Sequence, residues 1–232
     1  MAGQDSDHAT EVASDVYLLS EFPRRYLNAY VVGDVLVDAG TRWWGRRLVR
    51  RLRAHDIEKH VLTHAHPDHQ GMTAAVCEEI DIPVLCHEDE RAVVESGETS
   101  PPMPQNRTNE LFERFMAGDG HPVAEAVEAG DSVGEFEVVE TPGNAPGHIS
   151  LWREADGTVL LGDVLSNIHL FSLRYGLHEL PSRFTHSPTR SIESARKIAD
   201  LEPDLVCFGH GPPLTDGTRF QDFVADLGQS RR

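Results

Sequence analysis

Three histidines and one aspartate fall within six consecutive positions of this chain, in the run His64-Ala65-His66-Pro67-Asp68-His69. Neutral imidazole nitrogens and carboxylate oxygens are the ordinary ligands of zinc and of neighbouring divalent metals. In an extended segment, alternation places His64 and His66 on one face, where both can bind a single ion. Asp68 and His69 follow the turn at Pro67, so they point elsewhere and can hold a second ion. The run predicts a metal site rather than a solvated, histidine-rich turn.

Three further ligand-type residues each follow a strand-like segment in a glycine-rich bend: His148, Asp163 and His210. Glycine lets the backbone turn tightly, and strand ends hold side chains more rigidly than free loops do. Taken singly, each bend is consistent with a plain turn. Together with the run they complete two sets joined by a bridging carboxylate: His64, His66 and His148; Asp68, His69 and His210; and Asp163 between them. Each ion then keeps an open position, which is typical of a catalytic site.

Short β-branched segments alternate with helical patterns along the chain. We expect strands at 16–20, 28–37, 59–63, 83–86, 134–141, 149–152, 158–162 and 204–208. We expect helices at 43–55, 71–79, 88–96, 109–117, 191–201 and 219–227. This order predicts a layered α/β fold. No linker rich in proline, glycine or serine divides the chain, so we expect one domain over residues 1–232.

The spacing H-x-H-x-D-H, followed by a histidine after Thr-Pro-Gly, then by Gly-Asp and Gly-His-Gly, resembles the metallo-β-lactamase superfamily and most of all its glyoxalase II branch. All seven ligand positions match in order, across nearly the whole chain. The resemblance implies a four-layer αββα sandwich, with two mixed β-sheets flanked by helices and the metal site at one edge. It also assigns Asp38, in Asp38-Ala-Gly, to the support of the metal-binding loop.

Two features depart from the glyoxalase II pattern. Asn144 stands where many relatives have a histidine that is not normally a ligand. The chain of 232 residues also ends soon after His210, whereas glyoxalase II enzymes carry a C-terminal helical extension that contributes to glutathione binding. We therefore expect a related hydrolase that does not act on S-lactoylglutathione itself.

The implied activity is hydrolysis of a thioester or a related small carboxyl ester by a binuclear metal enzyme. Two divalent cations, expected to be zinc with iron or manganese as alternatives, lower the pKa of a shared water and hold the resulting hydroxide for attack on a carbonyl carbon. Asp68 is the expected catalytic residue, because it can orient the hydroxide and receive its proton. Two other activities stay open: a lactonase of the acyl-homoserine lactone type, and a mononuclear iron persulfide dioxygenase.

The segment after Asp163 is expected to select the substrate, since it mixes apolar, aromatic and basic groups as binding pockets do. Its candidate substrate-binding residues are Phe171, Arg174 and Tyr175. Arg174 and Tyr175 lie where glyoxalase II-like relatives place substrate contacts, whereas the alternative for Phe171 is an ordinary position in the core. Residues 101–116 are expected to form a second wall of the cleft.

The chain carries 21 basic against 38 acidic residues, a formal net charge of −17, and only Lys59 and Lys197 are lysines. Such a surface repels nucleic acid and anionic membranes, because phosphate binding depends on clustered lysine and arginine. We therefore expect a small-molecule substrate, with neither nucleic acid nor membrane as partner, and leave the oligomeric state open. The acid-rich, lysine-poor composition is similar to that of proteins from salt-accumulating halophiles.

No apolar run approaches the roughly 18 residues of a membrane span. The first residues lack the basic and apolar regions of a secretion signal, so we expect a cytoplasmic protein. Its three cysteines, Cys77, Cys86 and Cys207, are odd in number and lack C-x-x-C spacing. This argues against a disulfide framework and a structural zinc site, and the thiols are expected to be reduced.

Overall fold

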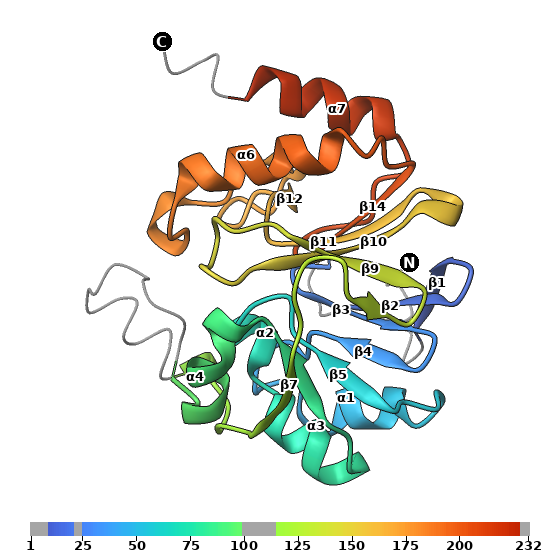
Figure 1. Ribbon diagram of the computed structural model, residues 1–232, viewed down its shortest axis with the longest axis vertical. Coiled ribbons are helices and arrows are strands. Elements are labelled where there is room, and N and C mark those ends of the chain that lie inside the picture. Colours follow the sequence, from blue (N-terminus) through green and yellow to red (C-terminus); the bar gives the residue numbers. More distant parts are fainter. Residues whose placement is uncertain (1–8, 21–24, 99–114, 228–232) are drawn as a thin grey trace.

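The computed structural model describes residues 9–20, 25–98 and 115–227. Two β-sheets lie face to face in the middle, and helices cover the outer side of each sheet, as the four layers of Figure 1 show from top to bottom. The expected four-layer αββα sandwich with two mixed sheets is confirmed. Among the described helices, none combines the length and the apolar character that crossing a membrane requires.

The first sheet contains seven strands in chain order, antiparallel from β1 to β4 and parallel from β4 to β7. They are β1 (Thr10–Ala13), β2 (Val16–Ser20), β3 (Asn28–Val32), β4 (Val35–Val37), β5 (Lys59–Val61), β6 (Val84–Cys86) and β7 (Val123–Ala126). Parallel neighbours need crossover connections, usually helical. The helices between these strands are α1 (Gly45–Leu52), α2 (Pro67–Gln70), α3 (Thr73–Ile80) and α4 (Glu88–Ser96).

The second sheet has the strand order β14-β11-β10-β9-β8, antiparallel except for the parallel pair of β11 and β14. Its strands are β8 (Ser132–Val133), β9 (Phe136–Glu140), β10 (Ile149–Arg153), β11 (Thr158–Gly162) and β14 (Leu205–Phe208). Between β11 and β14 lie a separate hairpin and a helix: β12 (Ser166–Ile168), β13 (Tyr175–His178), the 3-10 helix η2 (Ser182–Phe184) and α6 (Pro188–Ala199). The 3-10 helix η1 (Glu154–Asp156) joins β10 to β11, and α7 (Gly217–Asp226) follows β14.

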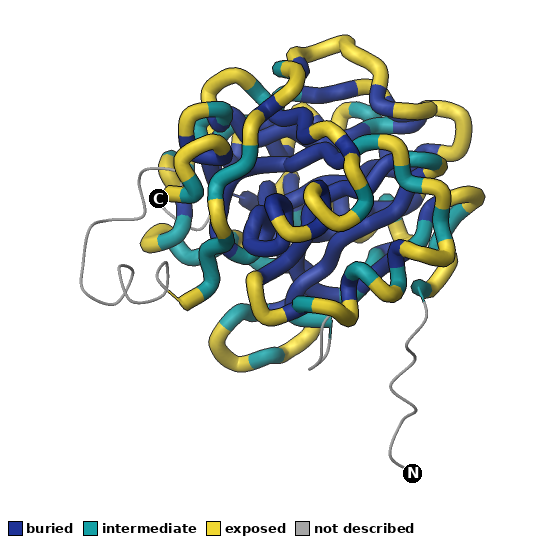
Figure 2. Tube along the Cα trace, turned by 90° about the horizontal axis from the view of Figure 1, so that it is seen from below, coloured by how far each residue is buried: buried dark blue, intermediate teal, exposed yellow. Residues whose placement is uncertain are grey.

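Apolar side chains fill the three spaces between the four layers. Between the sheets, inward-facing residues of both pack together, among them Val61 and Leu151. α1 turns Leu48 and Leu52 onto the first sheet, and α7 packs Phe220 against the second. Full burial of one such side chain contributes about 1.5–3 kcal/mol. Buried segments therefore gather inside a shell of exposed turns (Figure 2).

One edge of the sandwich collects the strand ends that carry the predicted ligands. The carboxyl ends of parallel strands open at a common edge, and β4, β5 and β6 end there in the first sheet, as β11 and β14 do in the second. The backbone N–H of Ile149, at the start of β10, donates to the carbonyl oxygen of Thr63 beyond β5 at 2.9 Å. The backbone N–H of Asn28, at the start of β3, donates to the carbonyl of Gly209 beyond β14 at 2.9 Å. Loops from both sheets therefore meet side by side.

Several predicted elements differ from the structure in their bounds. Residues 28–37 form not one strand but the antiparallel pair β3 and β4, because Gly33 and Asp34 make a turn between them. The predicted helix at 71–79 begins at Thr73, after the separate short helix α2. The sequence pattern does not mark β1, β7, β12 or β13, and the predicted helix at 109–117 lies largely outside the described residues. The three cysteines are buried and unbridged.

His60, in β5, is a buried imidazole outside the predicted ligand set. Its Nδ1 lies 3.1 Å from the carbonyl oxygen of Leu36 in β4, and its Nε2 lies 3.0 Å from Thr73 Oγ1 in α3. Burial lowers the pKa of His60 from 6.5 to about 4, because the charged ring would lose its hydration. The neutral ring therefore joins the first sheet to the helix that covers it.

We predict that acid weakens the fold through His60. The unfolded chain protonates this ring near pH 6.5 and the folded chain only near pH 4. Stability that is present above pH 6.5 is therefore lost as the pH falls toward 4, by about 3 kcal/mol for this group. H60Q, which takes up no proton, should be less stable at neutral pH and lose less on acidification. Urea unfolding of the metal-free proteins at several pH values gives the slope of the unfolding free energy against pH for the parent and for H60Q. Equal slopes would contradict the prediction.

Candidate metal centre

The seven predicted ligands meet where the two sheets share an edge. His64 and His66 lie in the loop after β5, and Asp68 and His69 lie in α2. His148 lies directly before β10, Asp163 directly after β11 and His210 shortly after β14. Five of the positions follow or precede a strand directly or by a few residues, and the other two lie in the short helix α2. The glycine-rich bends of the sequence therefore bring ligand-type residues from both sheets to one place.

His64 lies at the centre of the imidazole cluster. The centroid of its ring is 4.4 Å from that of His66, 4.2 Å from that of His69 and 4.9 Å from that of His148. All four rings are buried. The cluster thus forms one contiguous group rather than two separate pairs.

Two carboxylates lie beside the rings of His69 and His210. Asp163 Oδ2 is 3.5 Å from His69 Nε2 and 3.1 Å from His210 Nε2. Asp68 Oδ2 is 3.5 Å from the same nitrogen of His210. Asp163 therefore lies between two imidazoles that come from different sheets, as expected of a bridging group.

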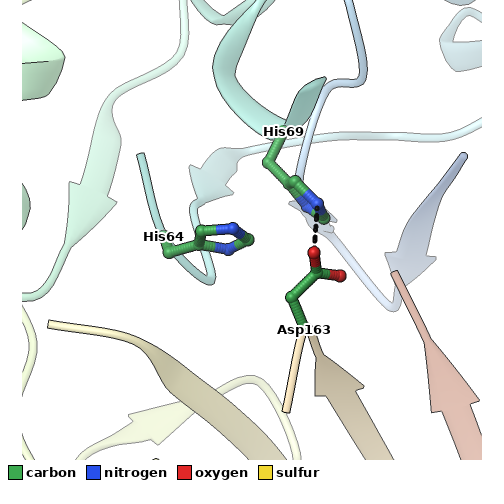
Figure 3. Close-up of side chains that lie close together, drawn as sticks. All are labelled: His64, His69 and Asp163. Carbon is green, nitrogen blue, oxygen red and sulfur yellow. Dashed lines mark ion pairs between the residues drawn. The ribbon is translucent and has the colours of Figure 1, made fainter. Parts of the chain in front are cut away.

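Three buried atoms in this cluster have no hydrogen-bond partner: His64 Nε2, His69 Nε2 and Asp163 Oδ1. Figure 3 shows the three side chains converging from the loop after β5, from α2 and from the end of β11. Each offers a ligand atom, and these atoms lie within 4.8 Å of one another. A buried polar atom left unsatisfied costs roughly 1–3 kcal/mol. Two nitrogens and one carboxylate oxygen aimed at one point fit a cation such as zinc, iron or manganese.

A second group of ligand atoms within the same limit consists of Asp68, His69 and His210. This is the set that the sequence predicts for the second ion. The set predicted for the first ion is arranged differently, because the ligand atoms of His66 and His148 belong to neither group. His148 has protein partners on both nitrogens: Nδ1 is 2.9 Å from Thr141 Oγ1, and Nε2 accepts from the backbone N–H of Asp163 at 2.9 Å.

Asp38, the residue predicted to support the metal-binding loop, is buried directly after β4. Its Oδ2 is 2.8 Å from His69 Nδ1. Its Oδ1 accepts from the backbone N–H of Thr63 at 2.8 Å, and the hydroxyl of Thr63 lies 2.9 Å from Oδ2. One carboxylate therefore fixes both the loop after β5 and the ring of His69.

These contacts determine which imidazole nitrogen faces the centre of the cluster. The Thr63 hydroxyl donates to Asp38, so it accepts from His64 Nδ1, 3.0 Å away. His210 Nδ1 donates to the carbonyl oxygen of Tyr26 at 2.7 Å. A ring that donates through Nδ1 keeps a lone pair on Nε2 when neutral. His64, His69 and His210 therefore present Nε2 to the centre, which is how outer partners orient metal ligands.

Gly162 allows the close contact between His148 and the end of β11. Its φ is +59°, and a Cβ at this position would lie 2.6 Å from His148 Nε2. Any L side chain would be strained there and would push the imidazole away. The Gly-Asp pair of the sequence is therefore needed to bring His148 and Asp163 together.

Side chains of the first sheet hold the loop that carries His210. Asn28 Nδ2 donates to the carbonyl oxygens of Phe208 and Gly211, at 2.9 and 2.7 Å. The hydroxyl of Tyr30 donates to the same carbonyl of Phe208 at 2.8 Å. The position of His210 thus depends on contacts that cross from one sheet to the other.

Burial and charge divide the imidazoles into two kinds. Burial, with repulsion from the neighbouring rings, lowers the pKa of His64 well below 6.5, and burial lowers the pKa of His148 to about 4. Burial acts in the same direction on His69 and His210, but the surrounding carboxylates together outweigh it. Asp163 and Asp38 raise the pKa of His69, and Asp163 and Asp68 raise the pKa of His210. Although burial opposes ionisation of Asp163, His210 and His69 hold its pKa well below the ordinary value. A bound cation would replace the protons on these two rings.

The sequence motifs give no sign of Glu90, a fully buried residue of α4 beside the cluster. Its carboxylate binds backbone N–H groups of two ligand loops. One signal was available in the sequence. Val93 and Val94 follow Glu90 by three and four residues, so helical spacing places its carboxylate on the apolar side of the predicted helix. All three residues are buried in α4.

Tyr26 is a second residue that the motifs do not mark. Its ring centroid is 5.7 Å from that of His210. Burial, together with the charges of Asp68 and Asp163, raises the pKa of Tyr26 to about 12. The phenol therefore keeps its proton at neutral pH and is a hydrogen-bond donor at the border of the cluster.

The candidate substrate-binding residues lie on the β12–β13 hairpin. Phe171 and Tyr175 are each 56% exposed, and Arg174 is exposed beside them. Phe171 is therefore not a core residue; its ring centroid lies 4.7 Å from Arg183 Cζ. The hairpin borders the cluster, because the N–H of Asn167 donates to the carbonyl of His210 at 2.9 Å. Most of the wall expected from residues 101–116 lies outside the described residues.

Comparisons with known proteins extend over the same part of the chain. Residues 23–210 match the family model of the metallo-beta-lactamase superfamily. YflN of Bacillus subtilis, named a probable metallo-hydrolase, is 31% identical over 214 residues, which cover 83% of this chain and 80% of YflN.

Two solved structures share this architecture. TTHA1623, in a di-iron-bound form, is 26% identical with a TM-score of 0.64, over 86% of this chain and 94% of its own. The B3 metallo-beta-lactamase BLEG-1 is 28% identical with a TM-score of 0.66, over 92% of this chain and 99% of its own. Since the family match includes all seven residues of the cluster, the chain belongs to the metallo-β-lactamase superfamily.

Proposed function

We propose that this protein is a binuclear metal-dependent hydrolase that cleaves a thioester or a related small carboxyl ester. The observation that carries the proposal is the convergence of three buried side chains, His64, His69 and Asp163, whose ligand atoms lie within 4.8 Å of one another and each of which has a polar atom without a hydrogen bond. A second group, Asp68, His69 and His210, adjoins it. The similarity to YflN, which is named a probable metallo-hydrolase, supports the same reaction class.

His64, His66, His148 and Asp163 would hold one ion, and Asp68, His69 and His210, with Asp163, the other. To join the first set, His148 would have to give up the hydrogen bond that its Nε2 accepts from the backbone N–H of Asp163. Divalent cations bound there lower the pKa of water toward neutrality and polarise a carbonyl oxygen. Zinc is the metal we propose, with iron or manganese as alternatives, and the di-iron form of TTHA1623 supports iron as a competitor. Asp163 supplies negative charge at the centre, where it also orients His69 and His210.

Asp68 is the residue we propose for proton transfer. Its side chain is 16% exposed, whereas that of Asp163 is 4% exposed, and both face His210. Asp68 is therefore the carboxylate that solvent and substrate can reach. It can orient the attacking water and receive its proton, while Asp163 stays in contact with the imidazoles.

The substrate class rests on the resemblance to the glyoxalase II branch and on the chemistry of the hairpin. Phe171 and Tyr175 offer apolar surface, and Arg174 offers a positive charge in a chain whose net charge is −17. Such a surface suits a small anionic acyl group. We propose that it binds the acyl or thiol part of the substrate, with no nucleic acid or membrane as partner and with the whole chain acting as one domain in the cytoplasm.

Replacement of Asp163 by Asn should remove metal and activity together. The amide keeps the size of the side chain but loses the negative charge that both groups share. We expect turnover to fall by more than about 100-fold, because even residues that only orient ligands cost about 10–100-fold. Metal content by elemental analysis and hydrolysis rates measure this. D222N, at an exposed position of α7, is the matched control; full activity of metal-free protein would refute the proposal.

Acyl thioesters should be the best substrates in a panel that also contains acyl-homoserine lactones, a β-lactam and S-lactoylglutathione. The assay is run in high potassium chloride, because the acidic composition favours a salt-rich source. Faster turnover of the lactones would favour the lactonase. Oxygen consumption with a persulfide by iron-loaded protein would favour the dioxygenase, and the similarity to BLEG-1 makes the β-lactam a necessary member of the panel.

Replacement of Arg174 by Ala should weaken substrate binding and leave the chemical step intact. The guanidinium contributes charge on the exposed hairpin rather than in the cluster, so we expect KM for an anionic thioester to rise about tenfold, a loss of about 1.4 kcal/mol, with kcat little changed. R190A, on the exposed side of α6, removes a similar charge elsewhere. Equal KM values in the two variants would exclude Arg174 from substrate recognition.

A further inference from the structure

Glu90 is a buried carboxylate that belongs to neither group of ligand atoms. It lies in the first turn of α4 and is 0% exposed. Burying a charge is costly unless it is paired or hydrogen-bonded. A helix N-terminus favours a carboxylate in its first turn, which offsets part of this cost. The remainder has to come from the contacts of the carboxylate itself.

The two oxygens of Glu90 bind two different ligand loops. Oε2 accepts from the backbone N–H of Ala65 at 2.9 Å, and Oε1 accepts from the backbone N–H of Gly147 at 2.9 Å. Each oxygen thus satisfies one backbone donor of a ligand loop. Ala65 lies between His64 and His66, and Gly147 directly precedes His148.

These two loops leave different sheets. The loop with Ala65 follows β5 of the first sheet, and the loop with Gly147 leads into β10 of the second. A backbone hydrogen bond from Ile149 to Thr63 also links them, at 2.9 Å. Glu90 adds a side-chain link on the other side of His148, so His148 lies between two connections to the loop of His64 and His66.

The packing around Gly147 is adapted to this contact. A Cβ at position 147 would lie 2.9 Å from Glu90 Cγ and 2.7 Å from His87 Nδ1. A side chain there would displace α4 from the loop. The glycine before His148 therefore lets the helix bring its carboxylate against the backbone.

We propose that Glu90 is a positioning residue that fixes the distance between the His64–His66 loop and the His148 loop, and thereby sets the affinity of the centre for metal. The inference rests on the metal centre of the proposed function. It adds a role for a residue of α4 that belongs to neither group of ligand atoms. A partner that orients ligands in this way typically affects metal affinity by about 10–100-fold.

The decisive variant is E90Q, with E88Q as its matched control. The Gln side chain keeps the shape of Glu, but its NH2 group cannot accept, so one of the two backbone N–H groups loses its acceptor. Glu88 lies in the same turn of α4, with an exposed carboxylate paired to Arg91, so E88Q makes the same charge change away from the loops. E90A removes both contacts.

Zinc affinity is measured by competition with a chromophoric chelator, starting from metal-free protein. We expect E90Q to bind zinc about 10–100-fold more weakly than the parent, E90A to bind more weakly still, and E88Q to match the parent. Amide hydrogen exchange in the metal-free proteins gives a second readout. The N–H of Ala65 or of Gly147 should exchange faster in E90Q, and both should do so in E90A.

A purely structural role predicts another pattern. It would lower the unfolding temperature of E90Q and leave the zinc affinity of the folded protein unchanged, and that result overturns the proposal. If E90A does not fold, E90Q decides alone. If the parent binds no zinc, iron or manganese, the proposed function fails. If the parent binds zinc and E90Q binds it more weakly, the role of Glu90 is supported. Equal affinities in E90Q and the parent would refute Glu90 alone.

Discussion

Five imidazoles and several carboxylates are buried at one edge of this sandwich, and the cost of burying them determines much of the surrounding structure. Each charge has a partner of opposite sign or a backbone donor: Asp38 has His69 and Thr63, and Asp163 has His69 and His210. A buried charge without such partners would shift its pKa and become neutral. His64, His69 and Asp163, whose ligand atoms converge, each keep one polar atom without a hydrogen bond. The buried polar groups of the cluster thus have protein partners except at the position where a cation fits.

This balance of charges requires the two sheets to be held in a fixed relative position. Asp38, His64 and His69 come from the first sheet, and His148, Asp163 and His210 from the second. Backbone contacts join the two at Thr63 and Ile149 and again at Asn28 and Gly209. The apolar layer between the sheets therefore does more than stabilise the fold, because it holds two halves of one polar site in contact.

The sequence predicts most strands of the two large sheets, most helices and the seven residues of the cluster, because each of these has a local signal, whereas β1, β7, β12 and β13 are missed. Apolar alternation marks β9, and a glycine next to a ligand-type residue marks the ends of β11 and β14. The turn at Gly33 was within reach of the same reasoning, since a Gly-Asp pair interrupts an apolar run. The four-layer arrangement follows from the family resemblance rather than from periodicity.

Other features depend on contacts between distant positions, which no local pattern encodes. Glu90 joins the loops of Ala65 and Gly147. The two hydrogen-bond partners of His148 are Thr141, which follows β9, and Asp163, which follows β11. Which histidines share a group of ligand atoms likewise depends on the distances between loops that leave different sheets. The halophilic source, the cytoplasmic location and the single domain stay predictions.

The hairpin of β12 and β13 pairs only with itself and belongs to neither large sheet. A change at its tip, residues 169–175, would break no hydrogen bond in the ladders that position the cluster and would leave the contact of Asn167 with His210 in place. Mutations can therefore accumulate on this segment, and alter which molecules the protein accepts, while the scaffold that holds the imidazoles is inherited intact. Such separation offers a physical route by which one ancestral centre diversifies into enzymes of different specificity.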